Sequence, residues 1–308
     1  MIYRLGWITV VLLIVQGCNN TAKPKVDKKS EQALNEVAVI APPPVITYHL
    51  MASKDFAADT ASDTFKIVLA LNRVDKAHYL RADSLVVPDT FYTDLLVYSP
   101  FPKHLPFLAD IKKLMFCSYR AEAFGVYQNG ELIKWGPCSM GKKATPTPTG
   151  LFHTNWRSKK TTSTVNSDWV MEWYFNLENR LGVSMHQFDL PGYPASHACV
   201  RLYKEDAMWL YTWCDQWLTN NDRIGSIRAY GTPVIIFGSY AFGQRRPWLD
   251  MAVSKDTLML GVDDMLVESN QYLQLIRERQ YARDSVLAQQ PLAAAVSKEQ
   301  QPVTKSKP

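Results

Sequence analysis

Hydrophobic residues at the start of the chain form one short run. It spans 11 residues, from Leu5 to Val15, behind the single positive charge of Arg4. As a helix it would be roughly 16 Å long, about half the ~30 Å hydrocarbon core of a bilayer, so we predict a signal-peptide core and not a membrane span. Residues 19–44 are polar, rich in lysine and end in three prolines. They cannot bury enough apolar surface to fold, and we expect a flexible tether.

Helical spacing of apolar residues comes next. It predicts a helix over 63–71, with Ser62 or Asp63 as its cap, and a short strand follows at 84–87. We expect these elements to form a small α/β subdomain over 45–111.

From Lys113 onward the pattern is typical of β-strands. Apolar and polar residues alternate, and two such stretches flank Asn129-Gly130, which predicts a hairpin. A helix is predicted over 205–218, where aromatic residues recur at i, i+4 spacing. Further strands are predicted near residues 150–155, 169–177, 182–186 and 234–237. The pattern therefore indicates a mainly β region that also contains one helix.

The end of the chain turns helical again after Pro247. This pattern continues to about Arg283, so we expect a helical extension over 246–284 and a disordered tail over 285–308, which is rich in Gln, Lys and Pro.

Composition and charge exclude several classes of protein. Hydrophobic residues make up 47% and charged residues 20%, which excludes a wholly disordered or fibrous chain. The net charge is only +5, and lysine and arginine crowd the two ends, so nucleic acid is not an expected partner. The many aromatic residues suit either a groove for an extended substrate or a β core.

The apolar run ends in a possible lipidation site. Val15-Gln16-Gly17-Cys18 resembles a bacterial lipobox, although Gln16 stands where a small residue is usual. We expect residues 1–18 to be a lipoprotein signal peptide and Cys18 to carry the lipid; an ordinary signal peptide with a chance cysteine is the alternative. The protein would then be anchored at the periplasmic face of the bacterial envelope, at the outer membrane rather than the inner.

Reactive residue types gather between 141 and 201. A thiolate at Cys199 is a strong nucleophile, and either His186 or His197 is a candidate to take its proton. Arg201, two residues beyond Cys199, can hold a carboxylate through two hydrogen bonds. Zinc, a Ser196 nucleophile and a buried structural cysteine are the competing interpretations. No cofactor and no metal are expected.

Several segments in this region resemble a known family. Ser196-His197-Ala198-Cys199-Val200-Arg201, with His186 upstream, is similar to the signature of the YkuD-like L,D-transpeptidases. The segments 124–132, 141–152 and 173–186 also resemble family motifs and occur in family order, so the resemblance implies a catalytic domain over about residues 112–245. Two departures stand out, because Ala198 and Gln187 replace glycines of the family pattern.

The resemblance implies a fold and a reaction. The fold would be a mixed β sandwich or barrel-like sheet with a packed helix. Cys199 would attack a tetrapeptide stem of peptidoglycan, and His186 would be the base. An amine of a second stem would then give a 3-3 crosslink, whereas water would give L,D-carboxypeptidase action.

The resemblance also implies roles for neighbouring residues. The backbone N–H groups of Ala198 and Cys199 would form the oxyanion hole, and His197 and Ser196 would be structural. Side chains expected to bind the substrate are Arg201, Trp173 and Tyr174, with core packing as the alternative for the two aromatic residues.

Other interpretations of the chain stay open. One is a catalytically inactive, lipid-anchored protein that binds peptidoglycan; another is a cysteine protease or amidase that acts on a different peptide. Residues 71–88 look like the second half of a degenerate LysM module, a peptidoglycan-binding fold. Cys117 and Cys138 are candidates for a disulfide in an oxidising compartment, and Cys214 is expected to be a core thiol.

Overall fold

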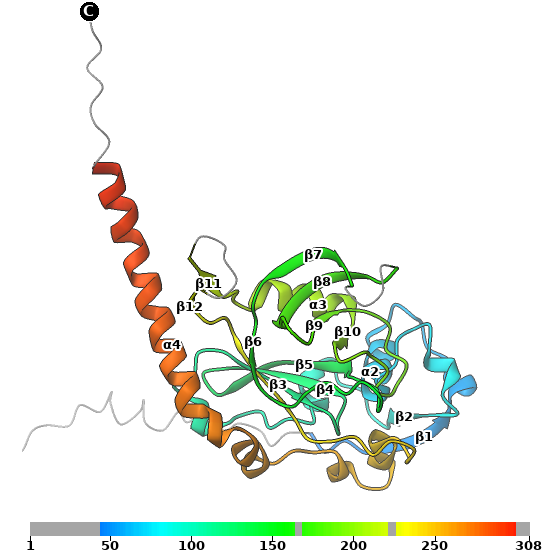
Figure 1. Ribbon diagram of the computed structural model, residues 1–308. Coiled ribbons are helices and arrows are strands. Elements are labelled where there is room, and N and C mark those ends of the chain that lie inside the picture. Colours follow the sequence, from blue (N-terminus) through cyan, green and yellow to red (C-terminus); the bar gives the residue numbers. More distant parts are fainter. Residues whose placement is uncertain (1–43, 164–167, 221–225, 300–308) are drawn as a thin grey trace, which may run out of the picture. The chain divides into compact units, whose positions relative to one another are not determined.

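The main element of the structure is a mixed nine-stranded sheet (Figure 1). The structure is a computed structural model, and it describes residues 44–163, 168–220 and 226–299. The strand order is β6-β13-β3-β4-β5-β10-β9-β8-β7, and the pairs β13–β3 and β10–β9 are parallel. The strands are β3 (Leu114–Ser118), β4 (Ala123–Gln128), β5 (Glu131–Ser139), β6 (Gly150–His153), β7 (Arg157–Thr162), β8 (Val170–Glu178), β9 (Val183–Gln187), β10 (Val200–Leu202) and β13 (Pro233–Phe237).

Smaller elements complete the fold. Two strand pairs lie outside the large sheet, and they are β1 (Tyr48–Ala52) with β2 (Ser84–Pro88), and β11 (Leu218–Thr219) with β12 (Ile227–Ala229). The α-helices are α2 (Asp63–Asn72), α3 (Lys204–Trp213) and α4 (Val262–Glu299). Short 3-10 helices lie at Ser53–Asp55, Tyr79–Arg81, Leu95–Tyr98, Pro106–Leu108, Pro247–Ala252 and Lys255–Thr257.

The predicted hairpin is confirmed. β4 and β5 pair antiparallel, and their turn residues Asn129 and Gly130 have φ angles of 51° and 82°. Two successive residues with positive φ match the right-handed twist of the strands that they join, which is why an Asn-Gly pair favours this turn.

The sheet is curled, and its edge strands β6 and β7 follow each other in the chain, joined only by residues 154–156. Just before β7, the N–H of Asn155 donates to the carbonyl of Asn176 on β8 at 2.8 Å, and the N–H of Asn176 donates to the carbonyl of Trp156 at 3.0 Å, which extends the pairing of β7 with β8. The concave side encloses a core of apolar residues from β3, β4, β8, β9 and β10, and α3 contributes Ala207 and Leu210 to it. The mainly β domain with a packed helix is therefore confirmed.

Helix α3 ends before the predicted position. The backbone of Cys214 is extended (φ −69°, ψ 142°), so the helix stops at Trp213 rather than at Leu218. The following residues bond to the sheet, since the N–H of Asp215 donates to Thr232 Oγ1 at 2.9 Å. The N–H of Trp217 likewise donates to the carbonyl of Asn155 at 3.2 Å, so hydrogen bonds to neighbouring segments replace the end of the helix that the aromatic spacing predicted.

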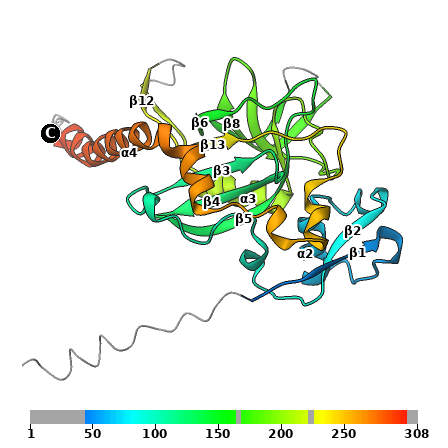
Figure 2. The ribbon, with the colours of Figure 1, turned by 90° about the horizontal axis from the view of Figure 1, so that it is seen from below.

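The N-terminal elements pack against the outer side of the sheet. The predicted helix and its cap are confirmed, because Ser62 Oγ accepts from the N–H of Phe65 at 3.2 Å at the start of α2. β2 is the predicted strand, and its partner β1 was not predicted (Figure 2). Arg73, at the end of α2, is 1% exposed and donates to the carbonyl of Ala121 at 2.8 Å, which ties α2 to the turn between β3 and β4 of the nine-stranded sheet.

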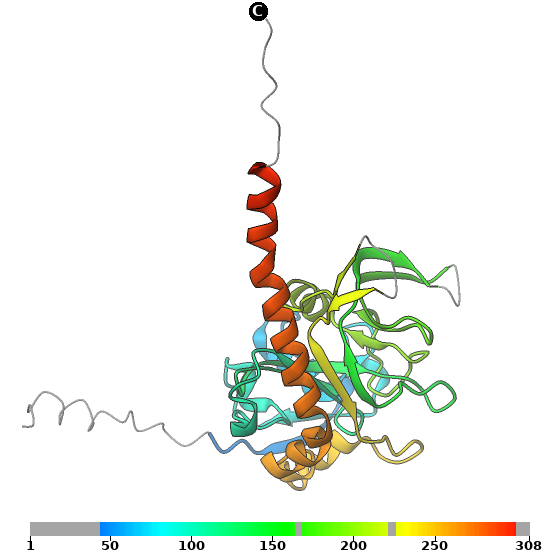
Figure 3. The same cartoon turned by 60° about the vertical axis from the view of Figure 1, so that its left-hand side comes forward.

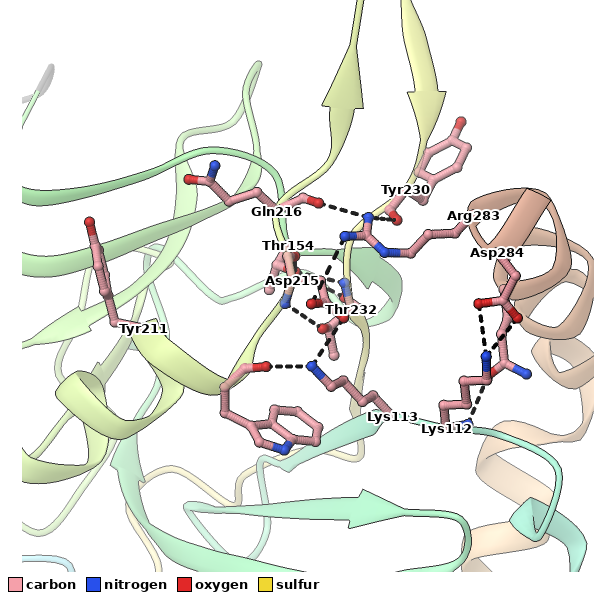
Figure 4. A network of polar contacts seen from close by, with 12 residues as sticks. Lys112, Lys113, Thr154, Tyr211, Asp215, Gln216, Tyr230, Thr232, Arg283 and Asp284 are labelled. Carbon is pink, nitrogen blue, oxygen red and sulfur yellow. Dashed lines mark hydrogen bonds and ion pairs between the residues drawn. The ribbon is translucent and has the colours of Figure 1, made fainter. Parts of the chain in front are cut away.

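Helix α4 contacts β12 and β13 and continues past Arg283 to Glu299, through residues that we expected in the tail (Figure 3). Polar contacts hold its middle turns: Lys112 Nζ lies 2.7 Å from a carboxylate oxygen of Asp284, and Arg283 donates to the carbonyl of Gln216 at 2.8 Å (Figure 4). Within the described residues, no helix is long and apolar enough to cross a membrane. The predicted signal peptide, Cys18 and nearly all of the tether lie outside these residues.

The candidate disulfide between Cys117 and Cys138 is absent. Cys117, Cys138 and Cys214 are buried free thiols. β4 separates the strands of Cys117 and Cys138, and Cys117 is paired in register with Phe124 of β4. Cys214 is 2% exposed in the core as expected, and burial raises its pKa to about 12.

Candidate active site

The pairing of two parallel strands brings the predicted catalytic residues together. Arg201 of β10 is in register with His186 of β9, and Cys199 immediately precedes β10. Side chains two residues apart on a strand share a face, so Cys199 and Arg201 face the same side as His186 and Ser184. The first three of these residues line a cavity of about 330 Å³.

The cavity is polar, aromatic and cationic. Arg180 and Arg201 line it, and none of the described residues that line it carries a carboxylate. Trp156, Trp169 and Phe188 contribute aromatic walls. Such a cavity suits an extended ligand that bears negative charge.

His186 has the protonation state that a general base needs. It is 5% exposed, and its Nδ1 lies 2.9 Å from the carbonyl oxygen of Gln187. Because a carbonyl can only accept, Nδ1 carries the proton and Nε2 keeps its lone pair. Burial, together with the positive charge of Arg201, lowers the pKa of His186 to about 4, against the opposing effect of the bond to Gln187. The ring is therefore neutral at pH 7.

Cys199 rests as a thiol. Its Sγ accepts from the hydroxyl of Ser184 at 3.2 Å and donates to the carbonyl of Gly182 at 3.5 Å. Burial raises the pKa of Cys199, while the bonds from Ser184 and the charge of Arg201 act in the opposite direction. Formation of the nucleophilic thiolate therefore needs a base, and His186 is the neutral imidazole on the same face.

A tight loop delivers Cys199 to the cavity. The hydroxyl of Ser196 donates to the carbonyl of Cys199, and the N–H of Ser196 donates to the carbonyl of Met140 at 2.9 Å. Ala198 has a φ of 76°, in the left-handed region. An alanine there costs roughly 1–2 kcal/mol relative to its ordinary conformation, so the family's glycine is replaced where glycine would be unstrained.

His197 is engaged by side chains beside the cavity. Its Nε2 accepts from Lys142 Nζ at 3.0 Å, and its ring lies 4.8 Å from that of Trp169. Burial and the charge of Lys142 lower the pKa of His197. These contacts fix the ring against the rim of the cavity.

The remaining predicted residues separate into two groups. Arg201 lines the cavity with its guanidinium 4.5 Å from the ring centre of Phe188, and Tyr174 lines it with its ring 6.4 Å from that of His186. Trp173 does not line the cavity; its ring meets the edge of Tyr211 at 5.5 Å. The register of β8 shifts here, Trp173 has a φ of 52°, and its side chain packs against the core, which is the alternative given above for this residue.

Several residues of the site were not predicted from the sequence. They are Trp156, Trp169, Arg180, Phe188 and Ser184. Ser184 had a usable signal, because it lies two residues before His186 on one strand. The described residues contain no group of three or more His, Cys, Asp or Glu side chains that could hold a metal ion.

Comparisons with known proteins agree with the sequence motifs. Residues 116–236 match the family model of YkuD, the L,D-transpeptidase catalytic domain. None of the curated proteins compared with the chain matches it.

Solved structures that match the chain include three bacterial L,D-transpeptidases. One from Stackebrandtia nassauensis is 18% identical, its match covers 42% of this chain and 57% of the solved chain, and its TM-score is 0.34. One from Mycobacterium smegmatis is 21% identical, its match covers 41% of this chain and 59% of the solved chain, and its TM-score is 0.33. L,D-transpeptidase 1 of Mycobacterium tuberculosis is 23% identical, its match covers 41% of this chain and 62% of the solved chain, and its TM-score is 0.31. The matches thus span about three fifths of each solved chain.

Proposed function

We propose that this chain, which contains an L,D-transpeptidase catalytic domain at residues 116–236, transfers a peptidoglycan stem peptide through a thioester on Cys199. One observation carries the proposal. A neutral His186 and a thiol at Cys199 face the same cavity from adjacent parallel strands, with Arg201 beside them. This is the set of groups that acyl transfer through a cysteine requires.

The first half of the reaction forms the thioester. His186 Nε2 takes the proton of Cys199, and the thiolate attacks the carbonyl carbon of the third residue of a tetrapeptide stem. The backbone N–H groups of Ala198 and Cys199 stabilise the resulting oxyanion. The C–N bond then breaks, and the imidazolium gives its proton to the leaving D-alanine. Its low pKa makes His186 a strong acid in this step.

The second half consumes the thioester. An amine of a second stem attacks the acyl carbon, His186 accepts a proton from that amine, and Cys199 leaves as a thiolate. The product is a 3-3 crosslink. Water in place of the amine gives L,D-carboxypeptidase action.

The charges of the cavity support a donor stem with free carboxylates. Arg201 is half-buried, and no salt bridge among the described residues occupies its guanidinium. Arg180 adds a second positive charge at the β8–β9 turn. We assign the binding of a stem carboxylate to Arg201, with Tyr174 as one wall of the cavity.

We also propose that lipidated Cys18 anchors the protein at the periplasmic face of the envelope, most favourably at the outer membrane. This rests on the short apolar run and the lipobox-like residues. A catalytically inactive wall-binding protein is the second candidate. In the loop of residues 196–199, Ala198 replaces the glycine of the family pattern, and its backbone has a positive φ.

Incubation with purified disaccharide-tetrapeptide, followed by mass spectrometry, tests the proposal. We expect release of D-alanine together with a crosslinked dimer or a tripeptide, and we expect Cys199→Ala to release none. Binding of the stem without release of D-alanine by the wild-type protein would favour the inactive alternative. Cleavage that does not depend on a D-amino acid would favour a protease or amidase.

A further inference from the structure

We infer that Asp75, which follows α2 outside the matched catalytic domain, takes part in substrate binding by holding the segment between His186 and Cys199. This segment, residues 188–195, is named the connecting segment. It begins with Phe188, whose ring contacts a cation of the cavity. The inference deepens the proposed function and rests on it. Asp75 acts through other residues and is therefore a positioning residue.

Asp75 pairs with both backbone polar groups of Leu190. Its N–H donates to the carbonyl of Leu190 at 2.9 Å, and its carboxylate Oδ2 accepts from the N–H of Leu190 at 2.8 Å. Leu190 is 0% exposed, so bulk water cannot replace either partner. Loss of the carboxylate would leave a buried N–H without an acceptor, which is costly. The connecting segment therefore depends on Asp75 at this point.

The carboxylate of Asp75 is itself fixed in place. Its Oδ1 accepts from the N–H of Ala77 at 2.8 Å and lies 2.6 Å from Nδ1 of His78. The side chains of Asp75 and His78 are 20% and 12% exposed, so this pair is largely shielded from water. A carboxylate that is held by one oxygen presents the other oxygen to Leu190 in one orientation.

The residue before Asp75 is also in close contact with the connecting segment. Val74 forms an antiparallel bridge with Pro191, and its carbonyl accepts from the hydroxyl of Tyr203, just after β10. A Cβ on Gly192 would lie 2.7 Å from Cγ1 of Val74, and Gly192 has a φ of 83°, so this approach requires glycine. The contact thus extends beyond Leu190 along the connecting segment.

The first residue of the connecting segment reaches the cavity. The N–H of Phe188 donates to the carbonyl of Leu202 at 3.1 Å, and its side chain lines the cavity. The guanidinium of Arg201 lies 4.5 Å from the ring centre of Phe188, which is a cation–π contact. Phe188 is two residues from Leu190, so a displacement of Leu190 is passed on to Arg201, the residue assigned above to a stem carboxylate.

The second half of the connecting segment has a different anchor. Ser139 Oγ donates to the carbonyl of Tyr193 at 2.8 Å and accepts from the N–H of Ala195 at 3.1 Å. Ser139 belongs to β5, so the large sheet fixes the approach to Cys199. Loss of the Asp75 contact should consequently weaken substrate binding and leave the reactivity of Cys199 largely unchanged.

Hydrogen–deuterium exchange of the full-length protein, followed on the peptide that contains residues 188–195, tests the local contact. Asp75→Ala should speed exchange of the Leu190 amide about tenfold, because its N–H loses the carboxylate acceptor. Peptides from β3 and β4 report on opening of the whole fold and should not change. Asp59→Ala is the matched control, since Asp59 accepts from the N–H of Ala61, two residues away. It should leave exchange at Leu190 unchanged.

The affinity for purified disaccharide-tetrapeptide tests the consequence for binding. It is measured by titration calorimetry in the Cys199→Ala background, which prevents turnover. Asp75→Ala should raise Kd about fivefold, because Arg201 is less well oriented toward a carboxylate, whereas Asp59→Ala should not change Kd. Both substitutions remove one negative charge, which by itself favours an anionic stem, so weaker binding would not arise from charge. With Cys199 present, alkylation by iodoacetamide should proceed within about twofold of the wild-type rate.

Unchanged exchange at Leu190 or an unchanged Kd in folded Asp75→Ala would overturn the inference. Alkylation of Cys199 that slows as much as binding weakens would show a general loss of structure and would also overturn it. If Asp75→Ala does not fold, Asp75→Asn, which keeps one of the two oxygen acceptors, takes its place and should raise Kd by less. A raised Kd in a protein whose wild type releases no D-alanine would leave the inference standing and refute the proposed function.

Discussion

Arg201 and His186 stand opposite each other in the register of the parallel strands β10 and β9. This pairing places Cys199, two residues before Arg201, on the face that carries the imidazole. A base that lies 13 residues upstream in the sequence thereby shares one cavity with the thiol. The parallel pair thus accounts for the separation of the histidine from the cysteine motif.

The two histidines near Cys199 are expected to respond differently to substitution. His186→Ala should lower turnover about 10²–10⁴-fold, because it removes the general base. His197→Ala should first lower the free energy of unfolding, since it removes the contacts with Lys142 and Trp169. D-alanine release and urea unfolding, measured on both variants, separate these effects. The assignment of the base would be wrong if folded His197→Ala were inactive and His186→Ala active.

The pH dependence of kcat/KM should reflect the low pKa of His186. A neutral base is required, and burial keeps this ring neutral down to a pKa of about 4, whereas an unperturbed histidine has a pKa of about 6.5. Activity should therefore persist as the pH falls through 6.5 and decline only toward 4. Returning each sample to pH 7 controls for unfolding. An acid limb centred near pH 6.5 would show that another histidine is the base.

The low pKa of His186 also makes the stability of the fold depend on pH. Between pH 6.5 and 4 the folded protein holds fewer protons on His186 than the unfolded chain does. The contribution of the neutral ring to the free energy of unfolding is therefore complete above pH 6.5 and is lost progressively toward pH 4. His153, whose pKa burial lowers to about 3, acts in the same direction. The urea midpoint should accordingly fall from pH 7 to pH 4. A midpoint that does not change over this range would contradict the neutral, buried state of both rings.

Backbone strain at Ala198 leads to a prediction about the family's glycine. Ala198→Gly relieves the positive φ, but glycine also gains freedom in the unfolded chain, so the free energy of unfolding should change by less than about 1 kcal/mol. Ala198→Val, with a branched Cβ, should be clearly less stable than Ala198→Gly. Urea unfolding of both variants measures this. A valine variant as stable as the glycine variant would exclude a left-handed backbone at this position.

Helix α4 should divide into a required and a dispensable part. Met265, Leu273 and Ile276 are buried against the body of the protein, and Arg283 and Asp284 make polar contacts with it. Removal of residues 285–308 should leave D-alanine release unchanged. Removal of residues 262–308 would uncover the apolar residues and should cost several kcal/mol of stability. A tenfold loss of activity in the shorter truncation would show that the end of α4 contributes to the site.

Local patterns in the sequence predicted the elements that depend on local physics. The Asn129-Gly130 hairpin and the capped helix α2 follow from turn chemistry and periodicity, whereas the pairing of Cys199 with His186 was expected from the resemblance to a family. β7 was missed because its residues 157–162 are all polar, and β10 because it spans only residues 200–202. Such strands form because neighbouring strands supply hydrogen bonds.

Long-range features escaped the sequence for a related reason. The position of Trp173 depends on a register shift between β8 and β9, and the free thiol of Cys117 depends on β4 lying between β3 and β5. These are properties of strand order, which the alternation of apolar and polar residues does not reveal.

Acylation of Cys199 is the central claim, and the mass of the intact protein after exposure to a carbapenem tests it most directly. A carbapenem resembles the acyl donor of this family and forms a stable adduct with its nucleophile. The wild-type protein should gain the mass of one carbapenem, located on the peptide that contains Cys199. Cys199→Ala should gain none. An adduct that persists in Cys199→Ala, or that maps to another residue in the wild type, would contradict the account.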